Sequence, residues 1–519
     1  MRPYAGAPRR GACRVSPPLL CAVATVLVLL SQMGTGSSGV GGPVPRRAGA
    51  LDGTTADLQA RVARLETLLS IKPPASPPAA AFEVFKADAV RAAVKHAWLG
   101  WRTHAYGFDE LRPLSRSGVN TFGGAGATAV DSLSTLWLVG LKDEFADARA
   151  WVAQKDYSQL GGNLFETTIR IVGGLLSAGA LSGDVMFFEK ARTVAGRMTS
   201  SFGTPTGIPC NAFPDATGCG RANLAEAGTL TLEFAYLSHV TKDPLYRELA
   251  ERTVHSLVLG RKRATCQLDG LYSNDVSTLD GSGACEGAMG GGADSFYEYL
   301  LKMYLLTGDV EYRTLWLESM DGLKKHLVRC SIDGIPFLAN NHNGARADTL
   351  EHLACFAPGM LALGDWPNSG ALALGLIESC VALYTSTRSG LGADGMHFHA
   401  AGGNETACLS DPKGHEANRA FSLRSPHSLQ RPEVVESLFY AYRFTKDPYY
   451  RDLGWRIFVS IENHTRVEAG YASSSNVDVV PPVLDDLQQS FFLAETLKYL
   501  FLLFSDDSVM DLSKWVRSW

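Results

Sequence analysis

The sequence lacks a basic block and a Cys-x-x-Cys pair, and each absence removes a class of function. Lysine and arginine number 48 against 53 acidic residues, so the formal net charge is −5 and positive charge is scattered along the chain. Nucleic-acid binding needs a basic patch with interleaved aromatics, and we therefore expect no nucleic-acid partner. Common zinc-binding motifs contain Cys-x-x-Cys, which does not occur among the ten cysteines, so no zinc site is expected.

Alternating polar and apolar runs are also scarce, whereas long apolar segments of helical period dominate from Phe82 onward. With 46% apolar residues the chain can bury a large core, but 519 residues exceed the usual size of a single core. Repeated helical units allow such a length, because each unit packs against its neighbours. We therefore predict one mostly helical domain over residues 82–519.

The first 81 residues differ in composition from the rest. Four arginines precede the apolar run LLCAVATVLVLL at 19–30, which is short for a membrane-spanning helix. No clean small-residue cleavage site follows it. We therefore predict that residues 1–33 are a cytoplasmic tail and type II signal anchor, with a cleaved signal peptide as the alternative. Residues 34–81, rich in Gly, Ser and Pro around one short helical piece, are predicted to be a stem.

An even set of eight cysteines follows the targeting segment, as expected in an oxidising compartment. They lie at positions 210, 219, 266, 285, 330, 355, 380 and 408. Their spacing alone leaves the pairing open. Two N-glycosylation acceptors, Asn404 and Asn463, agree with exposure in the lumen of the secretory pathway.

A turn motif recurs between the helical segments, in which an Asp is followed two or three positions later by an aromatic residue. Its acids are Asp143, Asp184, Asp243, Asp309 and Asp447. Asp suits the N-cap of a helix, and Pro448 suits the first helical position. The spacing of roughly 40 to 70 residues is typical of helical hairpins joined by capped turns.

An acidic residue precedes each of these five turns, and another precedes Asp506, by 11 to 18 positions. These acids are Asp131, Glu166, Glu226, Asp294, Glu433 and Glu495. At about 1.5 Å per residue, each lies at the opposite end of its helix from the turn, so all six face the same rim. If the hairpins close into a ring, the carboxylates meet at one mouth, although a single such acid is equally well explained as a partner of the helix dipole.

Second acids one turn on, Glu298 and Glu436, strengthen the first interpretation. Like charges at this spacing repel unless a proton or a cation lies between them. A mouth lined by carboxylates suits glycoside hydrolysis, which needs one protonated acid for the leaving oxygen and one ionised base for the attacking water.

Six blocks of the sequence resemble the signature blocks of glycoside hydrolase family 47, the class I α-1,2-mannosidases. They are AYGFDELRPLSRSG (105–118), NLFETTIRIVGGLLSAGAL (163–181), GADSFYEYLLK (292–302), EHLACFAPGMLALG (351–364), RPEVVESLFYAYR (431–443) and FFLAETLKYLFLLFSDD (491–507). The resemblance implies an all-α (αα)7 barrel of helical hairpins. It also implies calcium-dependent, inverting removal of terminal α-1,2-linked mannose from high-mannose N-glycans on glycoproteins.

The resemblance also implies a role for each matching position. Glu166 and Asp294 match the two candidates for the general acid, and Glu433 matches the general base. The residues that match sugar-binding positions are Asp131, Arg170, Glu226, Glu298, His352, Arg431, Glu436, Phe491 and Glu495. Arg170 lies one turn after Glu166, where a direct ion pair would conflict with the acid role. Cys355 and Cys380 match the family's disulfide.

The chain departs from the family pattern at two points. ER-type members carry an Arg where this chain has Gly292, which implies the broader trimming of Golgi-type members. The family's Thr-Glu-Ala-His-Pro block, whose Thr coordinates calcium directly, has no match in this sequence. We therefore expect no direct protein ligand for Ca²⁺, with Glu436 and Glu495 acting through water and a weakened affinity.

These patterns leave alternatives open. The preferred interpretation is a Golgi membrane enzyme with a lumenal catalytic domain, with the ER lumen or secretion as alternative locations. Loss of the calcium ligand instead suggests a mannose-binding, poorly catalytic lectin-like factor of glycoprotein quality control. Asp485 and Asp486 are a weak signature of a terpene cyclase, and we interpret them as charge at a helix N-terminus.

Overall fold

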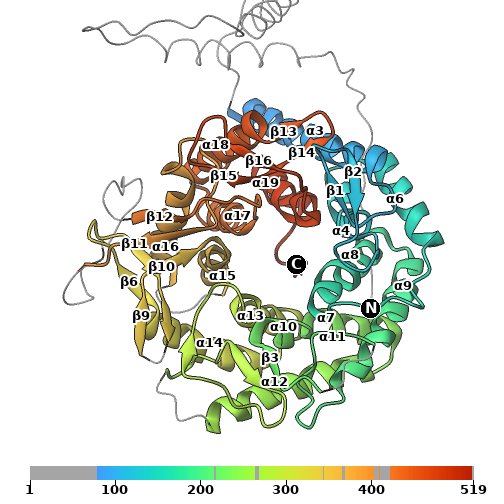
Figure 1. Cartoon of the computed structure of the whole chain (residues 1–519), viewed down its shortest axis with the longest axis vertical. Coiled ribbons are helices and arrows are strands. Elements are labelled where there is room, and N and C mark those ends of the chain that lie inside the picture. Colours follow the sequence, from blue (N-terminus) through green and yellow to red (C-terminus); the bar gives the residue numbers. More distant parts are fainter. Residues whose placement is uncertain are drawn as a thin grey trace, which may run out of the picture. The chain divides into compact units, whose positions relative to one another are not determined.

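The computed structural model describes residues 79–214, 218–263, 268–342, 344–364, 369–401, 408 and 421–516. The predicted signal anchor, the stem up to residue 78 and the acceptor Asn404 lie outside these residues. Lys86–Trp519 forms one compact unit, which contains a ring of helices (Figure 1).

The inner wall of the ring consists of seven helical segments in the described residues. They are α4 (Ala127–Asp131) with α5 (Leu133–Leu138); α7 (Leu164–Glu166) with the π-helix η1 (Thr167–Val172) and α8 (Gly173–Ser182); α10 (Leu224–Gly228) with α11 (Thr231–Thr241); α13 (Asp294–Thr307); the 3-10 helix η3 (His352–Phe356) with α15 (Ala357–Leu363); α17 (Glu433–Thr445); and the π-helix η4 (Phe492–Thr496) with α19 (Leu497–Phe504). Neighbouring segments pack together in this order, and α4 and α5 close the ring against η4.

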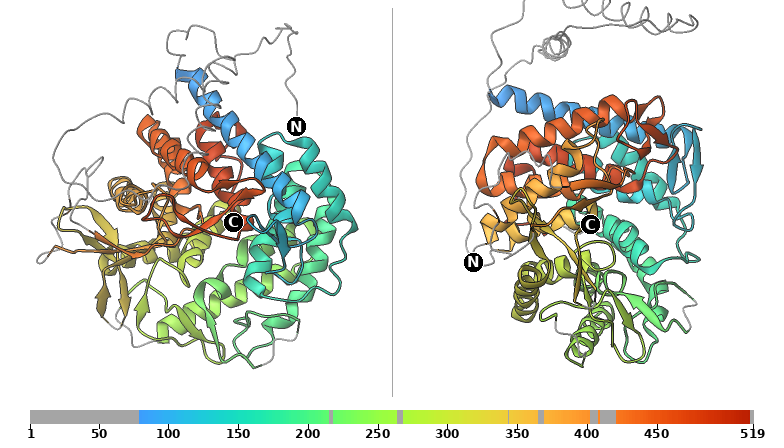
Figure 2. Two further views of the ribbon diagram at one scale, coloured as in Figure 1. Left: turned by 45° about the horizontal axis from the view of Figure 1, so that its top comes forward. Right: turned by 60° about the vertical axis from the view of Figure 1, so that its left-hand side comes forward.

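An outer wall of helices surrounds the inner wall (Figures 1 and 2), and in the described residues it has one helix for each inner segment. Its members are α3 (Ala79–His104), α6 (Lys142–Gln154), α9 (Val185–Met198), α12 (Leu245–Arg263), α14 (Val310–His326), α16 (Ser369–Thr385) and α18 (Pro448–His464). Six of them pack against the inner segment that precedes them in sequence, and the guanidinium of Arg91 on α3 lies over the ring of Phe501 on α19. The predicted (αα)7 barrel is confirmed.

The two walls differ in burial, as their positions require. Outer helix α9 buries one stripe, at Phe187, Ala191, Val194, Ala195 and Met198, which follows the helical period. Inner helix α13 is buried on all sides from Asp294 to Met303. Each fully buried Leu or Phe contributes roughly 1.5–3 kcal/mol, so the inner wall supplies much of the core. On α17 burial on all sides ends at Ala441, and Phe444 is exposed.

The predicted capping turns are present at most positions. Asp184, Asp309 and Asp447 are the N-caps of α9, α14 and α18, and each carboxylate accepts the backbone N–H two positions on. Asp243 makes the same hydrogen bond before α12. At Asp143 the prediction was wrong, because this residue lies inside α6, whose N-cap is Leu141.

Short antiparallel strands occupy the connections between helices. The pairs are β1 (Glu110–Arg112) with β2 (Ser117–Val119), β3 (Arg221–Asn223) with β4 (Asp275–Ser277), β6 (Val328–Cys330) with β7 (Pro336–Leu338), β13 (Arg466–Val467) with β14 (Gly470–Tyr471), and β15 (Ser473–Asn476) with β16 (Val483–Asp485). The three-stranded sheets are β5 (Glu286–Gly287), β8 (Asn340–His342), β9 (Ala345–Ala347), and β10 (Thr349–Glu351), β11 (Gly395–Phe398), β12 (Phe421–Ser425). Two of these sheets lead directly into helices that carry site residues.

Two further sequence interpretations concern these connections. Asp485 ends strand β16, and the carboxylate of Asp486 accepts the backbone N–H groups of Leu114 and Ser115. The prediction that these acids lie at a helix N-terminus was therefore wrong. Asp486 instead connects its own loop to the loop between β1 and β2. Among the described helices, one run, Leu164–Ser182, is long and apolar enough to cross a membrane, but most of it is buried inside the protein.

Candidate active site

The six acids that precede the turns lie at one end of the inner segments. Asp131 ends α4, Glu166 ends α7, Glu226 lies in α10, Asp294 begins α13, Glu433 begins α17 and Glu495 lies in η4. Closure of the ring brings these acids together, as the contacts below describe. Every residue assigned to the site from the sequence belongs to this one cluster.

Arg170 lies at the centre of one half of the cluster. It sits in η1, and its Nε donates to Oε2 of Glu166 at 2.8 Å, while its Nη1 lies 3.6 Å from Oδ2 of Asp131. Its guanidinium faces the rings of Phe122 and Phe491, with centroids at 4.9 and 5.5 Å. The direct ion pair that conflicts with an acid role for Glu166 is therefore present.

Glu110 and Ser490 join this half of the site and were not found from the sequence. Oε1 of Glu110 accepts the backbone N–H of Ser490 at 2.9 Å, and its Oε2 accepts the hydroxyl of Thr121 at 2.8 Å. The hydroxyl of Ser490 donates to Oδ2 of Asp131 at 2.6 Å. Glu110 lies on strand β1, so a search for acids at helix ends could not detect it, although it falls within the block 105–118.

Glu433 belongs to a buried chain of three side chains. Its Oε2 lies 2.8 Å from Nδ1 of His352, and Nε2 of the same ring lies 2.9 Å from the hydroxyl of Tyr384 on α16. Burial raises the pKa of Glu433, but the hydrogen bond and charge of His352, with the charge of Arg431, outweigh it and lower the pKa below its usual value. Glu433 is therefore a carboxylate near neutral pH.

The three-stranded sheet β10–β11–β12 positions this chain. His352 follows β10 directly, and its backbone N–H donates to the carbonyl of Asp394 at 3.0 Å. The carboxylate of Asp394 in turn lies 3.3 Å from Nε of Arg431, two positions before Glu433. Tyr384 and Asp394 were not predicted, because neither lies in one of the matching blocks.

Asp294 titrates in the opposite direction from Glu433. Burial raises its pKa to about 7, the backbone N–H and hydroxyl of Ser295 oppose this, and the charges of Glu433 and Glu298 add to it. Its Oδ1 accepts both Ser295 hydrogen bonds, at 2.8 and 3.2 Å. At neutral pH a large fraction of Asp294 therefore holds a proton while Glu433 does not.

Three other acids, Glu298, Glu436 and Glu495, form what we call the floor of the cluster. Glu298 forms an ion pair with Lys302 at 2.6 Å, and Oε1 of Glu436 accepts the hydroxyl of Tyr499 at 2.5 Å. Burial, with the charges of Asp131, Glu433 and Glu436, raises the pKa of Glu495 to about 8. This floor concentrates negative charge that a proton or a cation would neutralise.

Glu226 lies near Glu166, and Gly292 lies beside α10, where its carbonyl accepts the backbone N–H of Ala225 at 3.0 Å. Burial raises the pKa of Glu226, a hydrogen bond from Asn211 lowers it, and the charge of Glu166 raises it. Gly292 has a φ of +95°, and a Cβ there would lie 2.7 Å from Nδ2 of Asn223. A larger residue therefore does not fit at 292 without moving Asn223, which is the N-cap of α10.

Residues 93–518 match the family described as glycosyl hydrolase family 47. The chain belongs to glycosyl hydrolase family 47. It is 40% identical over 456 residues to the mannosyl-oligosaccharide 1,2-alpha-mannosidase MNS1 of Arabidopsis thaliana, covering 82% of this chain and 76% of that protein. It is 38% identical over 456 residues to mannosyl-oligosaccharide 1,2-alpha-mannosidase IB of Homo sapiens, covering 83% and 68%.

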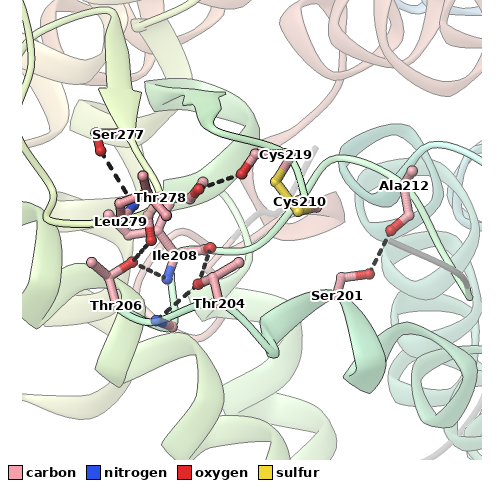
Figure 3. Close-up of a disulfide and its surroundings, with 11 residues drawn as sticks. Ser201, Thr204, Thr206, Ile208, Cys210, Ala212, Cys219, Ser277, Thr278 and Leu279 are labelled. Atoms are coloured by element: carbon pink, nitrogen blue, oxygen red, sulfur yellow. Dashed lines mark hydrogen bonds between the residues drawn. A yellow bond between two sulfur atoms is a disulfide. The ribbon is translucent and has the colours of Figure 1, made fainter. Parts of the chain in front are cut away.

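A solved family 47 relative has the same fold. The alpha-1,2-mannosidase from Trichoderma reesei superposes with a TM-score of 0.76 at 30% identity, over 81% of this chain and 93% of that one. The resemblance implies a disulfide between Cys355 and Cys380, and the structure contains it. Two further disulfides between cysteines that the structure describes join Cys210 to Cys219 (Figure 3) and Cys330 to Cys408.

Family 47 generally binds calcium, and the donors at the floor suit such an ion only in part. Buried carboxylates supply the hard oxygens and the negative charge that Ca²⁺ prefers. In the part of the chain that the structure describes, however, no group of three or more His, Cys, Asp or Glu side chains could hold a metal. These side chains therefore do not form a direct cage for a metal ion.

Proposed function

We propose that the chain is an inverting exo-glycosidase that removes terminal α-1,2-linked mannose from high-mannose N-glycans. The observation that carries this proposal is the buried pair Asp294 and Glu433, whose pKa values are displaced in opposite directions. One group that holds a proton and one that does not are what glycoside hydrolysis requires. The names of the family 47 relatives support the choice of sugar and linkage.

In the proposed mechanism Asp294 donates its proton to the glycosidic oxygen as the bond to the sugar breaks. Glu433 removes a proton from a water that attacks the opposite face, and inversion requires that the two carboxyl groups stand roughly 6.5 to 9.5 Å apart. His352 orients Glu433. We assign the ion pair of Glu166 and Arg170 to sugar orientation, because the cation beside Glu166 disfavours its use as the acid.

The remaining site residues are proposed to bind the sugar. Carboxylates such as Glu226 accept hydrogen bonds from sugar hydroxyls, and Arg170 and Arg431 donate them. The ring of Phe491, which faces both guanidiniums, offers an apolar surface for a sugar ring. The other members of this set are Asp131, Glu298, His352, Glu436 and Glu495.

The site is tested by incubating the purified chain with a high-mannose N-glycan and following the released sugar by NMR. We expect free mannose whose first-formed anomer is β, since inversion converts the α linkage. Release of no mannose, with calcium or with EDTA, contradicts the proposal. Glycan binding without release would instead favour the second candidate, a mannose-binding quality-control factor.

Golgi-like breadth is a further part of the proposal. Gly292 and the close approach of Asn223 support it, because they leave no bulky side chain at that point of the wall. The same incubation tests it through the ladder of glycan products. Successive removal of several mannoses agrees with breadth, whereas accumulation of a product lacking one mannose contradicts it.

We propose that this domain is displayed on the lumenal side of the Golgi membrane by a type II signal anchor at 1–33 and a stem at 34–81. The basic flank of the apolar run supports this orientation, and so does the exposure of Asn463 at the end of α18. Protease protection of the full chain in sealed vesicles, combined with removal of N-glycans, tests it. A chain released by carbonate washing would instead indicate a cleaved signal.

A further inference from the structure

Three consecutive glycines at 290–292, which we call the glycine turn, lead into α13 and its first residue, Asp294. The carbonyl of Gly290 accepts the backbone N–H groups of Ala293 and Asp294 at 3.2 and 3.1 Å. Ala293 is the N-cap of α13 and has no side chain that could hold these groups. The start of α13, and with it Asp294, therefore follows the position of the glycine turn.

On one side the glycine turn is joined to α10. The carbonyl of Gly292 accepts the backbone N–H of Ala225 at 3.0 Å, one position before Glu226. Gly292 has a φ of +95°, in the left-handed region that favours glycine. The turn thus connects the helix that carries Glu226 with the helix that carries Asp294.

On the other side the glycine turn meets the carboxylate of Glu351, the last residue of β10. Oε2 of Glu351 accepts the backbone N–H of Gly291 at 3.1 Å. A Cβ added to Gly290 would lie 2.5 Å from the same Oε2, so the carboxylate packs directly against the turn. Strand β10 pairs with β11, where Glu351 lies opposite Gly395. The sheet therefore determines where this carboxylate stands.

The residue next to Glu351 holds the other member of the buried pair. Nδ1 of His352 lies 2.8 Å from Oε2 of Glu433, and the backbone N–H of His352 donates to the carbonyl of Asp394 at 3.0 Å. Two consecutive residues thus support the two carboxyl groups, Glu351 through the glycine turn and His352 by direct contact. The placement of Asp294 relative to Glu433 depends on both supports.

We propose that Glu351 is a positioning residue for Asp294, which it holds at the separation from Glu433 that inversion requires. The inference rests on the proposed function, in which Asp294 is the acid and Glu433 the base. Proton transfer needs the acid within hydrogen-bond reach of the leaving oxygen, and a misplacement of about 1 Å can cost about 10²-fold in rate. Glu351 therefore acts on the rate of the reaction more than on the affinity for the sugar.

Two substitutions of Glu351 test the hydrogen bond to the turn. Glu351→Ala leaves the N–H of Gly291 without its acceptor, whereas Glu351→Gln retains a side-chain oxygen that can accept it. We expect kcat for an α-1,2-linked mannose disaccharide to fall about ten- to hundredfold in E351A, with KM changing less, and to be largely retained in E351Q. An equal loss of kcat in both variants overturns the proposal, because the charge would then matter and not the hydrogen bond.

Asp348→Ala is the matched control. Asp348 directly precedes β10, and its carboxylate forms an ion pair with Arg329, so the substitution removes a carboxylate contact at the same sheet without touching the glycine turn. The variants are compared at a temperature where circular dichroism shows each of them folded. We expect D348A to retain the wild-type kcat. A loss in D348A equal to that in E351A contradicts the proposal, because weakening of the sheet would then explain both.

Gly290→Ala approaches the same contact from the opposite side. The backbone at 290 has no positive φ, and the new Cβ would meet only the Glu351 side chain at close range, so the carboxylate has to move. We expect G290A to lower kcat as E351A does. In the double variant G290A/E351A the loss should not exceed that of E351A alone by more than about threefold, since the carboxylate is already gone. Losses that multiply in the double variant overturn the proposal.

The wild-type protein distinguishes failure of this inference from failure of the proposed function. A wild type that releases no mannose from the disaccharide removes the proposed function and with it the role of Glu351. An active wild type whose kcat is unaffected by E351A removes only the role of Glu351.

Discussion

At Asp294 and Glu433 the surroundings of two carboxyl groups give them different protonation states. Asp294 is buried beside like charges and accepts only the hydrogen bonds of Ser295, so its pKa rises to about 7. Glu433 is as deeply buried but accepts a hydrogen bond from His352, which lowers its pKa from 4.5. Burial alone raises the pKa of a carboxyl group, and the partner therefore decides which of the two keeps its proton.

The pH dependence of kcat/KM follows from these two groups. The acid must be protonated, so activity falls as pH rises through about 7, the pKa of Asp294. The base must be ionised, so activity also falls as pH drops through the pKa of Glu433, below 4.5. Asp294→Asn is expected to reduce kcat by about 10²- to 10⁴-fold and to remove the alkaline limb. A pH profile in which D294N retains that limb would assign it to another group.

The hydroxyl of Tyr384 is expected to matter for the rate because it contacts His352, which holds Glu433. Tyr384→Phe leaves Nε2 of His352 without its partner and loosens the ring that holds Glu433. We expect kcat to fall roughly tenfold with KM retained, as for loss of one neutral hydrogen bond. Tyr449→Phe is the matched control. The hydroxyl of Tyr449 donates to Glu378, which lies on α16 as Tyr384 does, so the control also removes one hydrogen bond to this helix. Equal kcat values for the two variants would contradict this positioning role.

Among the elements, the π-helices η1 and η4 adjust the mouth of the barrel. A π-helix has more residues per turn than an α-helix, and such segments are frequent at functional sites. Arg170 lies in η1 and Glu495 in η4, and the two segments flank the contact of Ser490 with Asp131. Regular α-helices would turn these side chains to other directions, so the site depends on both irregularities.

The capping turns are expected to contribute to stability and not to catalysis, because they lie at the opposite end of the helices from the acids. Asp309→Ala and Asp447→Ala each remove an N-cap hydrogen bond and should lower the free energy of unfolding by about 1 kcal/mol, and by about twice that together. Asp143→Ala is the matched control, since Asp143 lies inside α6 and caps nothing there. Denaturant unfolding measures the three, and an equal loss for Asp143→Ala would contradict the structural distinction.

At the scale of the whole molecule, closure of the ring gathers more negative than positive charge at one end. In the described residues nine acids meet four fixed cations there: Glu110, Asp131, Glu166, Glu226, Asp294, Glu298, Glu433, Glu436 and Glu495 against Arg170, Lys302, Arg431 and Lys498. Burial, together with these neighbouring charges, raises the pKa values of Asp294 and Glu495. We also expect this excess of negative charge to favour the binding of a divalent cation.

Removal of calcium is therefore expected to destabilise the barrel. A ligand that binds only the native state adds about 2.7 kcal/mol at 100 times its dissociation constant, so calcium added after EDTA should raise the midpoint of thermal unfolding. Magnesium should restore less, because it is smaller and releases its waters reluctantly. Mannose release is measured in parallel. Identical midpoints in EDTA and in calcium would contradict calcium binding to this chain.

The sequence by itself determined the helical hairpins, most of their capped turns and the end of the barrel at which the acids lie. These features depend on helical period and on residues a few positions apart, such as Asp447 and Pro448. The resemblance to family 47 added the candidate roles and the pairing of Cys355 with Cys380.

Only the tertiary structure decided which side chains meet. The pairing of Arg170 with Glu166, the support of His352 by Tyr384 and the contacts of Glu110 with Ser490 depend on the closure of the ring or on the formation of a π-helix. The proton on Asp294 has the same origin. A pKa depends on burial and on charges across the ring, and neither quantity is encoded in the spacing of residues along one helix.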